Sequence, residues 1–352
     1  TQIISMVIGI LIFCFMIWFM EDVSRVEKFH LYIGLFAIIF FVLNLVLGKS
    51  INGSRNWIRL GPLSIQPSEL IKIAFILFGS SSLDRLQTKK NMSEFLIFTA
   101  ICMGFLFIIK DFGTALIYFA CFMIIAFMRS GSIRTIALII AAIVLALALV
   151  FIFLPNLTEH ALSRFSGWRH IWEDPDDKGF QQTRMLTYLA SGGLTGSGLG
   201  QGYFKGIFGS ENDVVFASVC EEIGLAMGFV IIFAILLFVF NSRSDVTRSR
   251  STFYSITSCA AAGIILVQAI LNVLGSTDII PFTGVNLPFI SSGGSSLMSI
   301  WGMMAFLKAS DERTYAARRM SRKQAKIEDM EREYDIMNSH EYTNSRRKTE
   351  SW

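Results

Sequence analysis

The sequence predicts an all-α polytopic membrane protein. Of its 352 residues, 53% are hydrophobic and only 16% are charged, whereas a soluble domain carries about 25% charged residues. The apolar residues are also gathered into runs of roughly 17–25, the length that crosses a bilayer hydrocarbon core as a helix. Together these observations exclude a soluble enzyme, a nucleic-acid-binding module and a disordered protein.

Nine apolar runs are candidate membrane-spanning helices. The third and the last are short and rich in Ser, Gly or Pro, so the sequence defines their ends least well. The nine runs lie roughly at 1–20, 29–47, 67–82, 93–109, 112–128, 133–154, 214–240, 253–274 and 293–308.

Lys and Arg in the short connections predict the orientation, because cytoplasmic loops are enriched in these residues. If the nine spans alternate, all the basic connections lie on one side, which is then the cytoplasm. Residue 1 would lie outside, so we expect a tenth span to precede it and both termini to be cytoplasmic. The basic residues concerned are Arg25, Lys28, Arg85, Lys89, Lys90, Arg129, Arg134, Arg243, Arg248 and Arg250, with the tail from Lys308 onward.

The connections on the opposite side are long for a compact bundle, and such loops are usually functional or disordered. The largest, 155–213, is polar at first and then glycine-rich, and two others lie at 48–66 and 275–296. Aromatic and apolar residues persist through 185–208, so we expect that part of the large extracellular loop to re-enter or pack against the bundle.

The chain divides into two regions by composition. Residues 1–308 are predicted to form one transmembrane domain that includes the large extracellular loop. Residues 309–352 mix both charge signs and are predicted to form a cytoplasmic tail, helical to about Asp335.

Cysteine and acidic clusters give no indication of a disulfide framework or a metal site. The cysteines lie within apolar stretches without CxxC spacing, as small buried hydrophobes do. The acidic DPDD at 174–177 is more typical of a solvated turn than of metal ligands. The cysteines are Cys14, Cys102, Cys121, Cys220 and Cys259.

Glu69 and Lys72 are ionisable groups within a predicted span. Such groups are costly at membrane depth unless they are paired or hydrated, so each is a functional candidate. Their spacing of three places both on one helix face. One interpretation is a polar cavity in which Lys72 offers positive charge to an anion; the other is a neutralising ion pair that steadies the bundle.

Lys110 and Asp111, the first residues of KDFGTAL, begin a predicted span near the membrane interface. Charged groups are tolerated at that depth, so a structural pair at the end of a helix is as good an interpretation as a substrate contact.

Asp213 stands directly before an apolar run, in SENDVVFASVCEEIG. A carboxylate held at the rim of a cavity could act as a general base. An N-terminal helix cap explains the same position equally well. Glu221 and Glu222 follow two turns later and, being adjacent, cannot both face one cavity.

Several arginines lie in the predicted outer loops. Arg55 and Arg59 flank Trp57, and Arg164, Arg169 and Arg184 lie in the large loop. Guanidinium groups bind phosphate in a bidentate manner, which suits a phosphate-bearing substrate. Contact with lipid headgroups is the simpler alternative.

Several motifs, in this order, resemble those of the SEDS family (shape, elongation, division and sporulation), which includes RodA and FtsW. They are NGSRNWIRLGPLSIQPSELIKIA, DFGTAL, GFQ at 179–181 ahead of SGGLTGSGLGQG, NDVVFASVCEEIGL and LPFISSGGSSL. The resemblance covers the chain to about Lys308. It implies a bundle of ten spans and a glycosyltransferase that polymerises the peptidoglycan precursor lipid II at the outer face of the bacterial cytoplasmic membrane.

The resemblance also implies roles for individual residues. The family's essential acid maps onto Asp213, which we expect to be the catalytic base. Expected substrate-binding residues are Arg55, Glu69, Lys72, Lys110, Asp111, Gln181 and Ser291. Two departures are Ile109-Lys110, where members commonly have Gln-Pro, and Ser292, where a Tyr is usual.

The resemblance further implies a class B penicillin-binding protein as partner, with lipid II and membrane lipids as ligands. A divalent cation, Mg²⁺ or Mn²⁺, could share the stabilisation of a pyrophosphate leaving group, although no motif indicates a site. The rival function is a flippase or transporter of lipid-linked precursors, supported by many spans, intramembrane charges and glycine-interrupted helices. Against it, the distinctive residues gather on the outer side, and no inverted repeat is apparent.

Overall fold

The computed structural model describes most residues of the chain. They are 2–51, 54–60, 63–84, 89–134, 179–203, 211–247, 249 and 251–315, together with isolated positions at 137, 140–141, 168, 171–173, 175, 209, 320, 324, 327 and 330.

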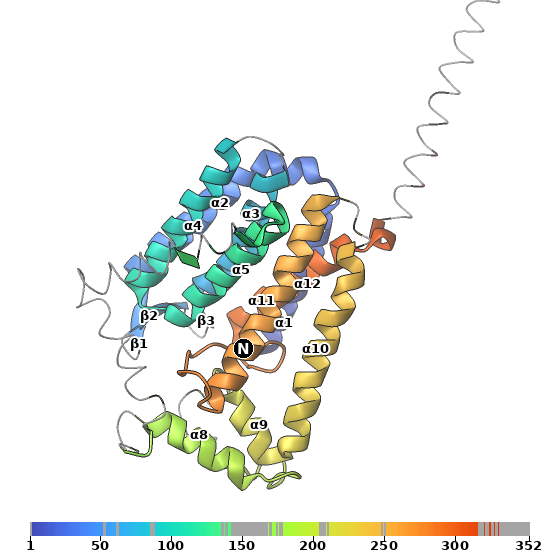
Figure 1. The fold of residues 1–352 in the computed structure, drawn as a ribbon. Coiled ribbons are helices and arrows are strands. Elements are labelled where there is room, and N and C mark those ends of the chain that lie inside the picture. The colour runs from blue at the N-terminus through green and yellow to red at the C-terminus, as the bar shows by residue number, and fades with distance from the viewer. Residues whose placement is uncertain are drawn as a thin grey trace, which may run out of the picture.

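The fold is a bundle of long helices with a small sheet and two shorter helices near one end (Figure 1). The elements are α1 (Gln2–Met20), α2 (Val23–Leu47), β1 (Lys49–Ile51), β2 (Ser54–Leu60), β3 (Leu63–Ile65), α3 (Pro67–Asp84), α4 (Lys89–Ile109), α5 (Phe112–Ser130), α8 (Phe180–Ser191), α9 (Val215–Ile223), α10 (Leu225–Thr247), α11 (Thr252–Ser276), α12 (Gly294–Ser310) and the 3₁₀ turn η2 (Glu312–Tyr315).

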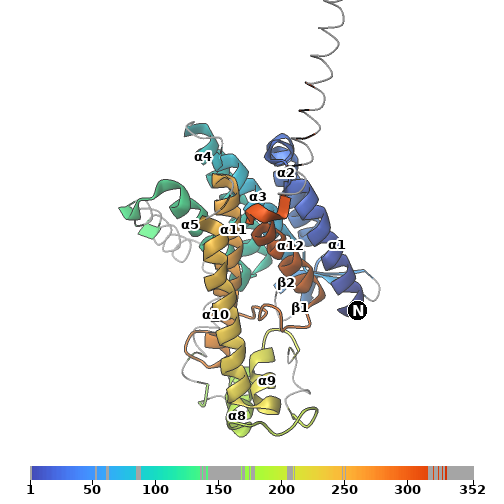
Figure 2. The same ribbon diagram turned by 90° about the vertical axis from the view of Figure 1, so that its right-hand side faces the viewer.

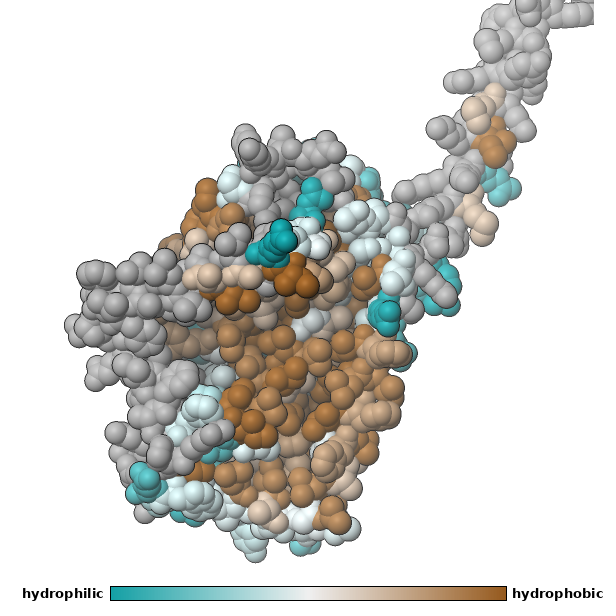
Figure 3. Space-filling view, in the orientation of Figure 1, coloured by the Kyte–Doolittle hydropathy of each residue, from teal (hydrophilic) through white to brown (hydrophobic). Residues whose placement is uncertain are grey.

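Five described helices are long and apolar enough to cross a membrane: Gln2–Met20, Val23–Leu47, Phe112–Ser130, Leu225–Arg243 and Thr252–Ser276. The expected spans at 67–82, 93–109 and 293–308 are also helical, as α3, α4 and α12. A broad apolar area covers much of one face of the bundle, with polar residues toward its two ends (Figure 3). The expected span at 133–154 and most of the tail beyond residue 315 lie outside the described residues.

Helix α11 forms the centre of the bundle and packs against α3, α5, α10 and α12. Two-thirds of its apolar stretch is buried, whereas α1, α2 and α10 are mostly exposed. Small residues permit close packing elsewhere: a Cβ added at Gly9 of α1 would overlap Trp301 of α12. A buried helix surrounded by helices with apolar outer faces is the arrangement expected in lipid.

The connection at 48–66 contains a small antiparallel sheet, which the sequence pattern did not predict. Its strand order is β1-β2-β3, with Ile58 paired to Ile65 and Arg59 to Ser64. The sheet leads directly into α3, so it fixes the start of that helix at the end of the bundle where α8 and α9 lie.

The single span expected at 214–240 is two helices, so that expectation is wrong in its outer part. The chain breaks at Gly224, which has φ of 97°, and the membrane-length helix begins only at Leu225. Views at right angles show the short α9 joining the long α10 at the α8 end of the bundle (Figures 1 and 2).

The glycine-rich segment 192–203 supplies the hydrogen bonds that this break leaves open. The carbonyls of Glu221 and Glu222 accept hydrogen bonds from the N–H groups of Ser197 and Gly198, at 2.9 and 3.0 Å. The N–H of Leu225 in turn donates to the carbonyl of Gly193, at 2.9 Å. Backbone polar groups away from water need such partners, so these hydrogen bonds stabilise the break between α9 and α10.

Helix α8 occupies part of the large loop and packs on α9. Met185 of α8, with Val214 and Ala217, forms a small buried apolar cluster. The expectation that this part of the loop packs against the bundle is therefore confirmed for α8.

Candidate active site

A cavity of about 290 Å³ lies where the sheet, the start of α5 and the loops before α9 and α12 meet. It contains two carboxylates and two cationic side chains, and its lining comes from four places in the sequence. The lining residues are Ser54, Asn56, Trp57, Arg59, Ser64, Gln66, Lys110, Asp111, Gly209, Asn212, Asp213, Thr283, Gly284 and Asn286.

Asp213 lies in the turn before α9, with its side chain half-buried at the cavity. The N-cap position of α9 is Val214, and no side-chain capping bond is made there. The alternative of Asp213 as a helix cap therefore does not describe this structure. Asp213 lines the cavity instead.

Gly209 and Gln181 lie beside the Asp213 carboxylate. A Cβ at Gly209 would overlap Asp213 Oδ1 and would lie 3.5 Å from Gln181 Nε2. Gly209 also has φ of 84°, a conformation that side chains with a Cβ rarely adopt. Glycine thus permits the close approach of the turn at 209–214 to α8.

Lys110 and Asp111 both line the cavity from the start of α5. Lys110 adopts φ of 65°, which turns the chain sharply between α4 and α5. Asp111 is the N-cap of α5: its Oδ1 accepts a hydrogen bond from the N–H of Thr114 at 3.2 Å, and its Oδ2 accepts one from Gln66 Nε2 at 3.0 Å. Asp111 is therefore both a cap and part of the cavity wall.

Glu69 and Lys72 form an ion pair inside the bundle. Lys72 Nζ lies 2.7 Å from Glu69 Oε2, and the two residues are 1% and 3% exposed. Neither belongs to the cavity lining. In this structure the two residues form the ion pair of the second interpretation, and their expected contact with substrate stays a prediction.

The structure also separates Arg55 from the cavity. Its side chain is exposed on β2, whereas Arg59, four residues further along the same strand, lines the cavity. The cationic residue that the sheet brings to this cavity is therefore Arg59 rather than Arg55.

Ser291 connects two loops behind the cavity. Its Oγ donates to the carbonyl of Asn212 at 2.5 Å and accepts from the N–H of Leu287 at 2.8 Å. Ser291 does not itself line the cavity. Its contacts hold the turn that bears Asp213, and its expected role in substrate binding stays a prediction.

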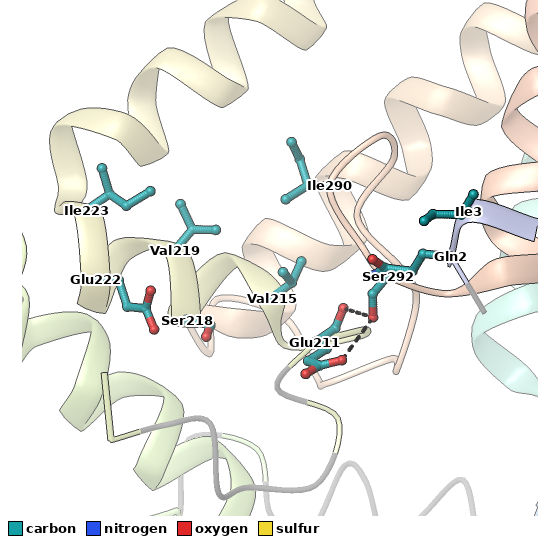
Figure 4. Close-up of a pocket in the computed structure, with 10 residues that line it drawn as sticks. All are labelled: Gln2, Ile3, Glu211, Val215, Ser218, Val219, Glu222, Ile223, Ile290 and Ser292. Atoms are coloured by element: carbon teal, nitrogen blue, oxygen red, sulfur yellow. Dashed lines mark hydrogen bonds between the residues drawn. The ribbon is translucent and has the colours of Figure 1, made fainter. Parts of the chain in front are cut away.

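A second, larger groove of about 610 Å³ lies along α9 (Figure 4). Val219, Ile223 and Ile290 form one side of this groove, and the carboxylates of Glu211 and Glu222 lie along the other. Of the adjacent pair, Glu221 is buried and accepts a hydrogen bond from the N–H of Tyr203 at 2.8 Å. Only Glu222 therefore faces a groove, and that groove is distinct from the cavity at Asp213.

Sequence reasoning did not single out Gln66 or Asn272, which support this site. Gln66 immediately precedes the PSEL motif, and Asn272 is a polar residue within an apolar run, a pattern that marks functional candidates in membrane helices. Within the described residues, no three His, Cys, Asp or Glu side chains gather as a metal site would require.

Comparisons with known proteins identify the family. The chain matches the family described as "Cell cycle protein", that of FtsW, RodA and SpoVE, over residues 1–315. It is 32% identical over 271 residues to the "Probable peptidoglycan glycosyltransferase FtsW" of Borreliella burgdorferi, covering 74% of this chain and 72% of the relative. A relative of the same name from Bacillus subtilis is 30% identical over 322 residues, 87% of this chain and 79% of that one.

Solved structures share the fold. A chain of a complex described as "Structural coordination of polymerization and crosslinking by a peptidoglycan synthase complex" has a TM-score of 0.72 at 21% identity, covering 90% of this chain and 89% of that one. The rod shape determining protein RodA of Thermus thermophilus has a TM-score of 0.61 at 22% identity, covering 87% and 84%. The chain therefore belongs to the FtsW, RodA and SpoVE family of multi-pass bacterial membrane proteins.

Proposed function

We propose that this chain is a peptidoglycan glycosyltransferase that polymerises lipid II, with Asp213 as the catalytic base. The observation that carries the proposal is one cavity that contains the Asp213 carboxylate together with the side chains of Lys110 and Arg59. Inverting transfer from a lipid pyrophosphate needs both a base and positive charge. The names of the relatives, peptidoglycan glycosyltransferases, support the same reaction class.

In the proposed reaction, a hydroxyl of the acceptor sugar attacks the anomeric carbon of the donor sugar. Asp213 accepts the hydroxyl proton as the new carbon–oxygen bond forms. The bond between the anomeric carbon and the pyrophosphate breaks, and polyprenyl pyrophosphate leaves with the electron pair. Attack opposite the leaving group inverts the anomeric centre.

The leaving group needs positive charge more than it needs a proton. Lys110 and Arg59 line the cavity and are the residues that would face the pyrophosphate. Arg suits this role because its guanidinium group binds phosphate oxygens in pairs, whereas Lys supplies a compact point charge. Such charge stabilisation of a developing anion is worth about 10²- to 10³-fold for each donor.

The lining residues also suit a divalent cation beside the pyrophosphate. Mg²⁺ is usually held by one or two carboxylates together with substrate phosphates, and Asp111 and Asp213 both line the cavity. Asp111 would hold such an ion together with the substrate phosphates, and the ion would supply further positive charge to the leaving group.

We propose that the α8 end of the bundle faces outward and that a class B penicillin-binding protein is the partner. The basic connections at the opposite end support this orientation. The likeness to a chain of a peptidoglycan synthase complex supports a partner of this kind.

The experiment that tests the proposal incubates the purified chain with labelled lipid II, with and without the partner, and resolves products on a gel. Glycan polymer is the expected result. Absence of polymer from folded protein with its partner would favour the flippase, and lipid translocation in vesicles would then be measured.

The packing at the centre of the bundle argues against a flippase path through it. Phe75 and Tyr118 pack with ring centroids 4.9 Å apart, near the buried Glu69–Lys72 pair.

A further inference from the structure

Asn272 of α11 joins the two loops that meet at the cavity. It is 2% exposed, and its side-chain Nδ2 donates to the carbonyl of Asp213 and to the carbonyl of Val285, each at 2.7 Å. An amide nitrogen carries two hydrogens. Both are used, one on the turn that bears Asp213 and one on the loop that forms the opposite wall of the cavity.

Three consecutive carbonyls of the Asp213 turn receive donors from the last part of the chain. The carbonyl of Glu211 accepts from the N–H of Ser292 at 2.8 Å, that of Asn212 from Ser291 Oγ at 2.5 Å, and that of Asp213 from Asn272. Two of these donors belong to the loop before α12. Asn272 alone belongs to a long, buried helix at the centre of the bundle.

We infer that Asn272 is the positioning residue for Asp213; this inference rests on the proposed role of Asp213 as base. The Asp213 peptide lies outside regular helix, because α9 begins two residues later at Val215. Two bonds hold this peptide: its N–H, on Val214, donates to the carbonyl of Gly209 at 3.3 Å, and its carbonyl accepts from Asn272. Only the second ties the peptide to the helices of the bundle. Asn272 fixes that peptide to the central helix α11 and so directs the carboxylate into the cavity.

The geometry requires an amide of this length. Leu has a similar volume but no donor, and Asp has the same shape but presents oxygens to the two carbonyls. Either replacement leaves the carbonyls of Asp213 and Val285 without this partner. Since catalysis tolerates little displacement of a reacting group, a shift of about 1 Å at Asp213 would cost on the order of 100-fold in rate.

The chain offers a matched control at Gln268, one turn earlier on α11. Gln268 is 0% exposed, and its two side-chain polar atoms have no hydrogen-bond partner among the described residues. Gln268→Leu removes a buried amide from the same helix without releasing the Asp213 turn. Removing an unpaired polar group is close to neutral for stability.

The test measures initial rates of lipid II polymerisation against lipid II concentration, for full-length Asn272→Leu, Asn272→Asp and Gln268→Leu. Thermal unfolding in detergent is measured in parallel. We expect kcat to fall about 10- to 100-fold in both Asn272 variants, with KM within about twofold of wild type because the binding side chains remain. Gln268→Leu should keep both parameters. The isosteric Asn272→Asp provides the readout if Asn272→Leu does not fold.

Three results would overturn the inference: unchanged kcat in the Asn272 variants, a change confined to KM, or an equal loss in Gln268→Leu. Asp213→Asn measured alongside separates the two proposals. If Asp213→Asn is inactive while the Asn272 variants retain full turnover, only the positioning role fails. If Asp213→Asn itself polymerises lipid II, the proposed function of Asp213 fails.

Discussion

Gln66 Nε2 donates a hydrogen bond of 3.0 Å to Asp111 Oδ2, joining the residue before α3 to the N-cap of α5. The backbone N–H of Gln66 donates to Ser295 Oγ at 3.2 Å. One residue, 6% exposed, therefore links three helices at the wall of the cavity. This link makes the position of Lys110, adjacent to Asp111, dependent on Gln66.

Gln66→Leu should reduce polymerisation about tenfold and destabilise the protein by about 1.5–3 kcal/mol, because a buried bond to a charged group is lost. Rates and thermal unfolding would be measured together. Ser64→Ala is a suitable control, since Ser64 also lines the cavity but is exposed. Full activity in Gln66→Leu would show that Asp111 keeps its place without this bond.

Lys72→Met should destabilise the protein by about 3–5 kcal/mol, because it leaves the Glu69 carboxylate buried without a partner. The double variant Glu69→Gln, Lys72→Met removes both charges and should recover most of that loss. The stability of wild type, Lys72→Met and the double variant would be measured by unfolding in detergent. If the double variant is as stable as wild type yet cannot bind lipid II, Lys72 contacts substrate after all.

Gly209→Ala should abolish most activity while leaving the fold intact, because its Cβ would overlap the Asp213 carboxylate. Gly131→Ala is the matched control: Gly131 also has positive φ, 58°, but nothing lies within 4 Å of an added Cβ. It should lose only about 1–2 kcal/mol of stability, the cost of left-handed backbone. Equal activity losses in the two variants would refute a specific effect on Asp213.

Glu221→Leu should release the glycine-rich segment, since the Glu221 carboxylate accepts from the N–H of Tyr203. We expect faster proteolysis within 197–203, detected by mass spectrometry of the fragments. Glu221→Gln keeps an acceptor oxygen and should resist the protease as wild type does. Equal cleavage of the two variants would mean that the carboxylate does not hold the segment.

The spans were predictable because the length of an apolar run directly reflects the thickness of the membrane. The break at Gly224 was not, since the hydropathy stays high across 214–240 while the backbone changes direction. The glycine-rich segment that forms hydrogen bonds with the backbone at the break lies more than twenty residues earlier in the chain. Only the fold places these two segments together.

The sequence motifs predicted several residues of the site correctly. They did not predict which residues of β2 would face the cavity, because that depends on how the strands pair. Lys110, Asp111 and Asp213 gather at one cavity, with Gln181 beside Asp213. The choice of Arg59 over Arg55 depends on the twist and pairing of β2, which the alternation of residues does not give. A spacing of three allowed Lys72 either to pair with Glu69 or to face a ligand, and in this structure Lys72 pairs with Glu69.

The most direct test of the central claim compares wild type and Asp213→Asn in polymerisation of labelled lipid II, with the penicillin-binding partner present. We predict polymer from wild type and a loss of about 10²- to 10⁴-fold in Asp213→Asn, the usual contribution of a general base, with unchanged thermal unfolding. Polymer formed at the wild-type rate by folded Asp213→Asn would contradict the account.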